Sequence, residues 1–352
     1  MTPVRVVDTH RLSTVAHGYE REMVQFYNDL IAIPATSGHE GPVIERMRRE
    51  IERAGFEEIR IDPLGNILGR IGSGKHVVMM DAHADTRGVG GARAGMAAMV
   101  YAGKLIHELG MYDDFTLWVV GSVQKEECSG LAWLYILKED GIRPDCVLIT
   151  EPTNLCIYRG ERGRVEFRIR LRDNGPDATG LVREVERLNQ RLPHDPILGA
   201  GSIAVTEIPG ADAIHGERLL TMGETREGAL DEVRALSGAE GAEIEIPVYD
   251  RPSYTGLRYP MEKYYPAWVL DESHPLVQAG IATYEALFEL PPVIGKWTAG
   301  ASGAGSMALM GVPAIGFGPG EEAMASNVGH MVKAAQFYAA FPMTFVETAR
   351  RR

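Results

Sequence analysis

The sequence predicts an α/β protein with a mostly parallel sheet, into which a smaller α+β domain is inserted. In the first half of the chain, short apolar segments alternate with amphipathic ones, such as residues 76–80 followed by residues 95–109. Strands that alternate with helices are typical of a parallel sheet. The middle of the chain instead contains strands of alternating polarity, and the α/β pattern returns from about residue 285. A length of 352 residues also favours two domains.

The predicted main domain is discontinuous and covers residues 1–165 and 285–352, whereas the inserted domain covers residues 166–284. In the main domain we expect helices over 17–34, 43–55, 95–109, 128–138 and 330–341, a hairpin over 57–71, and strands over 76–80, 115–121, 145–150 and 313–317. In the inserted domain we expect strands over 165–171, 202–206 and 243–248, and helices over 179–192 and 225–236.

Composition narrows the class of partner. The net charge of -12 argues against nucleic acid or an anionic membrane surface as a partner. The three cysteines form no paired framework, which favours a reducing compartment. The first residues do not resemble a signal peptide, and no apolar run reaches the length of about 18 residues that a membrane span needs. We therefore expect a cytoplasmic protein that binds a small molecule, with no nucleic acid or membrane partner.

Polar residues gather at the predicted strand ends. His83 and Asp85 follow the apolar run 76–80, and Glu126 and Glu151 follow the next two predicted strands. In open α/β sheets, functional groups collect beyond the carboxyl ends of the strands. The pattern therefore predicts that these four side chains share one site.

An imidazole beside several carboxylates is typical of a metal-assisted hydrolase. Such an enzyme needs metal ligands and a carboxylate that accepts a proton from the metal-bound water. His83 and Asp85 are two residues apart, so on an extended strand they point the same way and the carboxylate can orient the imidazole. Each signal also has a structural interpretation. A His-x-Asp pair can simply hold a strand end, and the pair Glu126-Glu127 can form a solvated surface.

Segments along nearly the whole chain resemble the M20 family of metallopeptidases and amidohydrolases, which includes acetylornithine deacetylase, succinyl-diaminopimelate desuccinylase and carboxypeptidase G2-like enzymes. The matching segments are IPATSGHEG, DPLGNILGRIG, VVMMDAHADT, GMAAMVYAGKLIHELG, TEPT, YRGERGRVEFR, LTMGETREGALDEVRAL, KWT and GFGPGEEA. The resemblance implies a catalytic α/β domain and a ferredoxin-like inserted domain through which two copies form a homodimer.

The resemblance also implies roles for individual residues. His83 matches a metal ligand, Asp85 matches the residue that orients this ligand, and Glu151 matches a carboxylate ligand of the same metal. Arg218 and Gly318 match substrate-binding positions.

Two alignments of the Glu-Glu pair remain open. In the first, Glu126 is the general base and Glu127 is a metal ligand. In the second, which is fixed by Cys128 and Gly130 further along the chain, Lys125 takes the base position and Glu126 the ligand position. A lysine would have to be held neutral to act as a base.

The sequence departs from the family pattern at three segments. Residues 86–94 lack the aspartate that normally bridges two metals, and residues 171–176 lack the histidine of the inserted domain. Near the C-terminus, His330 is the remaining candidate for a ligand histidine, a few residues later than in the family. Without a bridging anion two cations repel each other, so we expect one divalent ion, Zn²⁺, Mn²⁺ or Co²⁺, rather than two.

Our first hypothesis is a metal-dependent hydrolase that cleaves a C–N bond of a small carboxylate-bearing molecule, for example by deacylating an N-acyl amino acid. A variant of this hypothesis is the hydrolytic deamination of an aromatic amine. The alternative is a scaffold of the same fold without efficient catalysis, which serves in binding or assembly. A further interpretation is that internal segments of the natural sequence are missing near Gly90 and Arg172.

Overall fold

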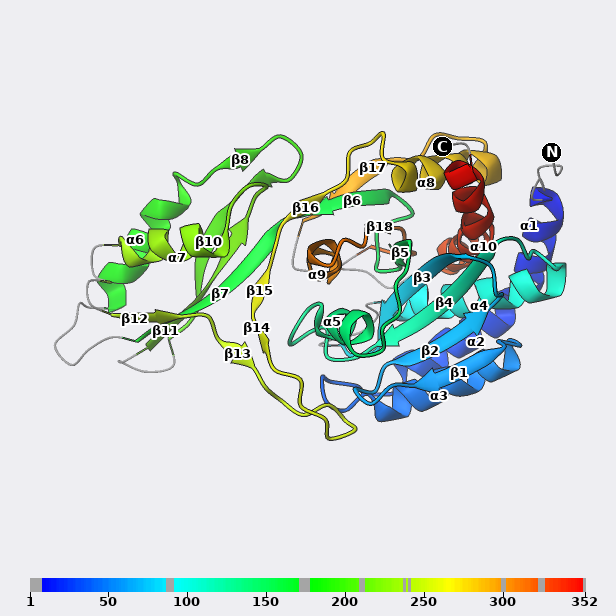
Figure 1. Ribbon diagram of the computed structural model, residues 1–352, viewed down its shortest axis with the longest axis horizontal. Helices are drawn as coiled ribbons and strands as arrows, with labels where there is room; N and C mark the ends of the chain where they lie inside the picture. The colour runs from blue at the N-terminus through cyan, green and yellow to red at the C-terminus, as the bar shows by residue number, and fades with distance from the viewer. Residues whose placement is uncertain are drawn as a thin grey trace.

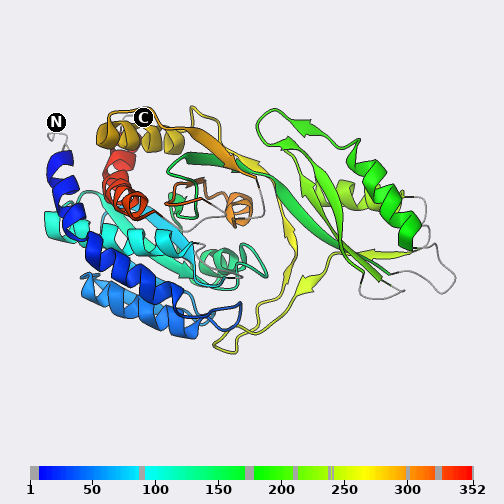
Figure 2. The ribbon, with the colours of Figure 1, turned by 180° about the vertical axis from the view of Figure 1, so that it is seen from behind.

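The computed structural model has two lobes, each built on its own sheet (Figure 1). The structure describes residues 8–86, 92–170, 178–208, 213–236, 239, 242–298, 302–321 and 327–350. The larger lobe contains both ends of the described chain, and the smaller lobe is connected to it through strand β7 (Gly163–Arg170) and the segment around the short strand β15 (Tyr264–Tyr265) (Figures 1 and 2). This arrangement confirms the predicted α/β class with an inserted smaller unit.

The larger sheet is parallel at its centre and antiparallel at its margins. Its strand order is β1 (Glu58–Ile61), β2 (Ile67–Ile71), β4 (Phe115–Ser122), β3 (His76–His83), β5 (Cys146–Ile149), β18 (Ala314–Gly316), β6 (Ile157–Glu161) and β16 (Trp268–Val269), with β17 (Ile294–Trp297) paired to β6. The neighbouring strands β4, β3, β5 and β18 are all parallel to one another. Their carboxyl ends therefore meet at one edge of the sheet.

Helices cover both faces of this sheet. One face packs against α1 (Thr9–Gly18), α2 (Glu20–Ile31), α3 (Gly41–Arg53), α4 (Arg93–Leu109), α8 (Pro275–Phe288) and α10 (Val328–Arg350). The other face packs against α5 (Leu131–Lys138) and α9 (Ala304–Leu309). Strand β3 shows why both faces are apolar, since Val78 and Met80 point into the first layer and Met79 into the second.

The smaller lobe is an antiparallel sheet with two helices. Its strand order is β10 (Ser202–Glu207), β11 (Ala213–Leu220), β7 (Gly163–Arg170) and β12 (Glu243–Glu245), with β15 (Tyr264–Tyr265) paired to β7, and its helices are α6 (Ala178–Asn189) and α7 (Arg226–Arg234). Along β7, Val165, Phe167 and Ile169 are buried and the residues between them are more exposed, as expected for a sheet with one covered face. Two short pairs complete the chain, β8 (His194–Asp195) with β9 (Gly199–Ala200) and β13 (Val248–Tyr249) with β14 (Met261–Glu262).

Several elements differ from the sequence-based expectation. The predicted helix over 17–34 corresponds to α2, and an unexpected helix, α1, precedes it, since the chain leaves helical geometry between the two at Tyr19 (φ -94°, ψ 0°). Strands β6 and β11 were not expected. The smaller sheet lies between Gly163 and Tyr265, whereas our predicted insertion ended at residue 284. Helix α8 packs on α10 in the larger lobe because its apolar face, with Leu276 and Val277, joins that core.

Local sequence explains the hairpin β1–β2. Asp62 accepts hydrogen bonds from the backbone N–H groups of Gly65 and Asn66, and Gly65 has a positive φ of 107°. A positive φ costs glycine little, so the turn closes without strain.

The helices of the described residues are all too short or too polar to span a membrane.

Candidate functional site

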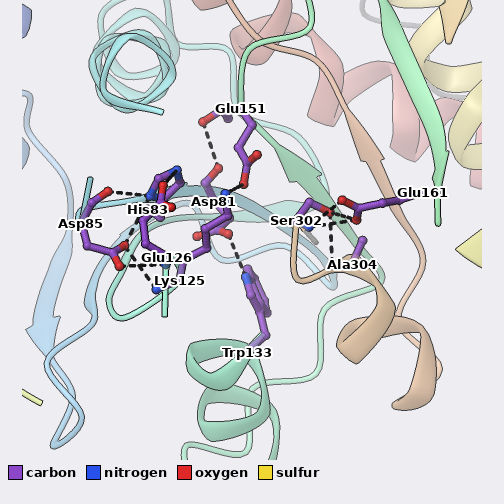
Figure 3. A network of polar contacts seen from close by, with 11 residues as sticks. Asp81, His83, Asp85, Lys125, Glu126, Trp133, Glu151, Glu161, Ser302 and Ala304 are labelled. Carbon is purple, nitrogen blue, oxygen red and sulfur yellow. Dashed lines mark hydrogen bonds and ion pairs between the residues drawn. The ribbon is translucent and has the colours of Figure 1, made fainter. Parts of the chain in front are cut away.

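Three strand ends, those of β3, β4 and β5, deliver the predicted site residues to one edge of the larger sheet. His83 ends β3 and pairs in register with Ser122 at the end of β4, while Asp81 pairs with Ile149 at the end of β5. Glu151 follows β5 by two residues, as His83 follows Asp81, so the two side chains lie on neighbouring strand ends (Figure 3). The expected convergence of these strand ends is present.

The orientation of His83 is fixed by Asp85. The His83 Nδ1 atom is 2.7 Å from the Asp85 carbonyl oxygen and 3.3 Å from its Oδ1. A carbonyl oxygen only accepts hydrogen bonds, so Nδ1 carries the proton and donates it. The other nitrogen, Nε2, points towards Glu126, whose Oε1 is 4.0 Å away. Burial lowers the pKa of His83, but the hydrogen bond to Asp85 and the charge of Glu151 raise it more, and the net shift is upward.

Asp85 also holds the loop after β4. Its Oδ2 accepts hydrogen bonds from the backbone N–H of Glu126 at 2.8 Å and from the Ser37 hydroxyl at 2.6 Å, and its Oδ1 accepts one from the backbone N–H of Lys125 at 3.2 Å. Burial raises the pKa of Asp85, but its hydrogen bond and ion pair with His83 lower it more, so Asp85 is a carboxylate. One ionised side chain thus positions both the imidazole and the loop.

Lys125 points into the same group of residues. Its Nζ is 3.2 Å from Glu151 Oε1, and the two side chains are only 21 % and 14 % exposed. Burial lowers the pKa of Lys125, but the charges of Glu151 and Glu126 raise it above its usual value. Lys125 is therefore a cation and not the neutral amine that a base would have to be.

The structure bears on the two alignments of the Glu-Glu pair. The side chains of Lys125 and Glu126 lie beside Glu151 and His83 (Figure 3). The charge of Glu127 instead acts on Tyr249. Burial is the largest cause that raises the pKa of Tyr249, and neighbouring charges, including that of Glu127, raise it further. This placement favours the alignment with Lys125 at the base position and Glu126 at the ligand position.

Gln124 and Glu40 form hydrogen bonds that hold the loop after β4 in place. Gln124 is fully buried and has a positive φ of 59°, which is uncommon for a residue other than glycine. Its backbone N–H donates to Glu40 Oε1 at 2.8 Å, and its side-chain amide donates to the Tyr249 hydroxyl at 3.0 Å. These contacts fix the backbone from which Lys125 and Glu126 extend.

Two further buried acids, which were not among the predicted site residues, lie near this group. Asp81 is 5 % exposed and accepts a hydrogen bond from Trp133 Nε1 at 2.9 Å. Burial raises the pKa of Asp81 to about 6. Its spacing of two residues from His83 was a signal that could have identified it, because alternate residues of a strand share a face.

The second acid, Glu161, ends β6 and is 3 % exposed. Its carboxyl group accepts hydrogen bonds from the Ser302 backbone N–H at 2.9 Å and from the Ser302 hydroxyl at 2.7 Å (Figure 3). Burial raises the pKa of Glu161 to about 8, and the charges of Glu151 and Lys125 also act on it. Glu161 lies in the segment YRGERGRVEFR, but nothing in its spacing indicated burial.

The remaining predicted residues lie elsewhere or have other contacts. His330 begins α10, and the charged groups that shift its pKa, after burial, are Lys333 and Glu321 rather than the site carboxylates. Arg218 is fully buried in the smaller lobe, where it pairs with Glu224 and Glu232.

The backbone N–H of Gly318 donates to Thr153 Oγ1 at 2.9 Å, so this group is already used within the protein. Roles for Gly318, Arg218 and His330 in binding stay predictions. The departures from the family pattern at residues 87–91, 171–176 and 325–326 lie outside the described residues.

The residue types at this edge suit a divalent metal, but their arrangement does not fit one. Within the described ranges, no group of three or more His, Cys, Asp or Glu side chains is placed to hold a metal ion. His83 and Glu126 face each other, whereas Glu151 is paired with the Lys125 ammonium. The expected set of His83, Glu151 and one of Glu126 or Glu127 therefore does not close around a cation.

Solved structures of known proteins share this fold. The dipeptidase Dug1p of Saccharomyces cerevisiae superimposes with a TM-score of 0.72 at 10 % identity, covering 97 % of this chain and 99 % of that one. The YXEP protein of Bacillus subtilis, described as a dinuclear metal-binding peptidase of the M20 family, gives a TM-score of 0.68 at 14 % identity over 94 % of this chain and 99 % of its own. The fold is that of the M20 family, as the sequence resemblance implied, and no family model matches the chain.

A relative of higher identity is the uncharacterized protein YgeY of Escherichia coli K12, which is 41 % identical over 389 residues that include 95 % of this chain and 96 % of YgeY. This chain belongs to the same family as YgeY. The alignment is longer than the 352 residues of this chain, so YgeY contains segments that this chain lacks. Shortened segments near Gly90 and Arg172 are consistent with that difference.

Proposed function

We propose that this chain is a hydrolase that cleaves a C–N bond, in the first instance an amide, of a small carboxylate-bearing molecule. The observation that carries the proposal is the convergence of His83, Glu151, Lys125 and Glu126 from three parallel strand ends. Buried ionisable groups whose pKa values are shifted by burial and by each other are typical of active sites. Proteins with the same fold, such as the dipeptidase Dug1p, support amide cleavage as the reaction class.

The side chains suggest roles in such a reaction. His83 carries a proton on Nδ1, and once the pH exceeds its raised pKa the imidazole is neutral, so Nε2 can then accept a proton from an attacking water and return it to the leaving nitrogen. In that sequence a C–O bond forms, the C–N bond breaks and the proton ends on the amine. The Lys125 ammonium can stabilise the negative charge that develops on the substrate oxygen, or pair with a substrate carboxylate.

The expected metal ion of our sequence-based hypothesis, Zn²⁺, Mn²⁺ or Co²⁺ on His83, Glu151 and Glu126, does not fit the residues as they are arranged. Lys125 pairs with the carboxylate that such an ion would use. We therefore assign proton transfer to His83 and charge stabilisation to Lys125, without a metal ion.

The test is a hydrolysis assay on a panel of N-acetyl amino acids, N-succinyl amino acids, dipeptides and aromatic amines, with released amine, acid and ammonia measured by mass spectrometry. Each substrate is tested with chelator-treated protein and again with added Zn²⁺, Mn²⁺ or Co²⁺. We expect turnover of at least one N-acyl amino acid, and a loss of about 100-fold or more in His83→Ala. Ammonia released from an aromatic amine would identify the deaminase variant instead.

His76→Ala is the matched control, because His76 begins the strand that His83 ends. Equal loss of activity in both variants would assign the effect to stability. Absence of turnover for every substrate in every condition would overturn the hydrolase proposal.

One observation favours the second candidate function, a scaffold of the same fold without efficient catalysis. The ion pair between Lys125 and Glu151 places a cation where the general base of the family is expected. Under this proposal the protein binds small carboxylates without turning them over. Binding of an N-acyl amino acid that is detectable by calorimetry, without any hydrolysis, is the result that would support it.

We also propose that two copies form a homodimer through the smaller lobe. Strand β10 stands at one end of that sheet's strand order, and beside it Val182, Val185 and Ile203 line a groove between α6 and β10. A strand at the end of a sheet can pair with the same strand of another copy. Light scattering should give twice the mass of 38.5 kDa, and Thr206→Pro, which removes a backbone donor on β10, should give monomers. A monomeric wild-type protein would rule out this assembly.

A further inference from the structure

Lys125 is outnumbered by carboxylates at the edge of the larger sheet. Its Nζ is 3.2 Å from Glu151 Oε1, and its charge also interacts with those of Glu126 and Asp85. Glu151 and Asp85 follow neighbouring strands, and a group of anions at this spacing repels itself unless a cation lies among them. The ammonium of Lys125 is such a cation.

A divalent ion at this site would compete with Lys125 directly. Glu151, His83 Nε2 and Glu126 would be its ligands. The distance between His83 Nε2 and Glu126 Oε1 is already 4.0 Å. An ammonium 3.2 Å from the Glu151 oxygen would then lie close to the ion, and two cations at short range repel strongly in a partly buried site.

The loop around Lys125 limits its escape. The Lys125 backbone N–H donates to Asp85 Oδ1, and the preceding residue Gln124 is fixed by Glu40 and Tyr249. The backbone position of Lys125, from which its side chain extends towards Glu151, is therefore fixed. Its flexible four-carbon stem is the part that could swing away, and doing so would leave the buried carboxylates uncompensated.

We propose that Lys125 is the resident cation of this site: its ammonium pairs with Glu151 in place of a divalent ion and keeps the metal affinity of the protein low. The proposal rests on the location of the site given under the proposed function, but not on its chemistry. It explains how a chain with the M20 fold keeps His83, Glu126 and Glu151 without bringing them around a metal.

The test measures the binding of Zn²⁺ and Mn²⁺ by equilibrium dialysis and by competition with a chromophoric chelator. Lys125→Met removes the charge and keeps most of the stem, and we expect its affinity for one ion per chain to rise roughly tenfold or more over the wild type. Lys125→Arg keeps the charge and should bind as weakly as the wild type. Lys75→Met is the matched control, because it removes a lysine that is 68 % exposed and paired with Asp114 at the other end of the sheet.

A double variant, Lys125→Met with His83→Ala, identifies the place of binding, since the gained affinity should be lost again. Circular dichroism and thermal unfolding check that each variant folds, and Lys125→Gln replaces Lys125→Met if the latter does not. Tight binding of one ion by the wild type, with no gain in the charge-removing variant, would overturn the proposal. Absence of binding in both proteins would overturn it as well, because Lys125 would then not be what excludes the metal.

The hydrolysis assay separates this proposal from the proposed function. A gain of metal affinity in Lys125→Met without turnover by any variant would leave the resident cation intact and refute the hydrolase. Turnover by a wild-type protein that binds one metal tightly would instead support the hydrolase and refute the resident cation.

Discussion

Each lobe contains a cation paired with carboxylates, and the two cations, Arg218 and Lys125, differ in burial and in their partners. In the smaller lobe, Arg218 is fully buried and pairs with Glu224 and Glu232, while Thr221 donates two further hydrogen bonds to Glu224. In the larger lobe, Lys125 is 21 % exposed and interacts with the three carboxylates of Glu151, Glu126 and Asp85, of which Glu151 is the one within ion-pair distance.

This comparison separates a structural cluster from a functional one. Every nitrogen of the Arg218 guanidinium has a partner, since Nε and Nη2 donate to Glu224 and Glu232 and Nη1 donates to the Leu219 carbonyl oxygen, so the cluster needs no ligand. At the site, the excess of acid over base is accompanied by raised pKa values of Asp81 and Glu161, whose largest cause is burial. An unbalanced and partly open cluster can take up a further charged group, whereas a balanced one serves the fold.

The largest expected effect is on stability in the smaller lobe. Arg218→Met should lower the free energy of unfolding by about 3–5 kcal/mol, because it leaves Glu224 buried without its partner. Arg234→Met, which breaks an exposed pair with Asp231, should change it by no more than about 1 kcal/mol. Urea denaturation followed by fluorescence and circular dichroism measures both. Equal losses in the two variants would remove the distinction between complete and incomplete clusters.

The next effect concerns the dependence of stability on pH. The pKa of Glu161 is about 8 in the folded protein, against 4.5 as its ordinary value, so the folded state retains a proton that the unfolded state releases. The stabilisation is complete below pH 4.5 and is lost as the pH rises to about 8, by on the order of 5 kcal/mol.

Glu161→Gln should remove this loss, because a neutral amide does not titrate. The difference in unfolding free energy between wild type and variant, measured from pH 5 to 8.5, isolates this one group from all others that titrate. Parallel curves would show that Glu161 is ionised in the folded protein.

A smaller effect is expected where Gly318 packs against the strand that leads to Glu151. A Cβ atom on Gly318 would lie 2.0 Å from the Glu151 carbonyl oxygen and 2.5 Å from that of Thr150, so Gly318→Ala should cost about 1–3 kcal/mol. Gly180→Ala is the control, since a Cβ atom there meets no other atom within 4 Å, and alanine favours its helix α6. A tolerated Gly318→Ala would mean that the end of β5 can shift freely.

The smallest effect is expected at Ser37. Ser37→Ala removes the 2.6 Å hydrogen bond to Asp85 and should cost about 1 kcal/mol, with the pKa of Asp85 rising because one cause of its low value is lost. Thermal unfolding and a carboxyl-resolved NMR titration measure the two changes. Ser13→Ala, on the exposed side of α1, should change neither.

Much of the fold could be predicted from the chain alone, because alternation and apolar runs report directly on burial. The segments that became β3, β4 and β5 are mostly apolar, and in the structure both of their faces are covered by helices. The insertion boundary could not be predicted well, since α8 is amphipathic like any surface helix and only its packing on α10 assigns it to the larger lobe.

The site was predictable in its location but not in its balance of charge. Strand ends indicated where His83 and Glu151 would meet, since register follows from parallel pairing. The ion pair of Lys125 depends on the loop geometry at Gln124, and a positive φ outside glycine leaves no signal in a sequence. Burial of Glu161 depends on Ser302, which lies 141 residues away in the chain.

The position of β18 between β5 and β6 affects how the protein is made. Strand β5 ends at Ile149 and its parallel partner β18 begins at Ala314. A ribosome that adds about 5–20 residues per second needs roughly 10–30 s to cover that interval, during which β5 presents a bare, apolar edge. The smaller lobe lies wholly within the interval and can fold first, so the nascent larger lobe is the stage most exposed to misassembly. A chaperone that covers strand edges should therefore raise the yield of correctly folded protein.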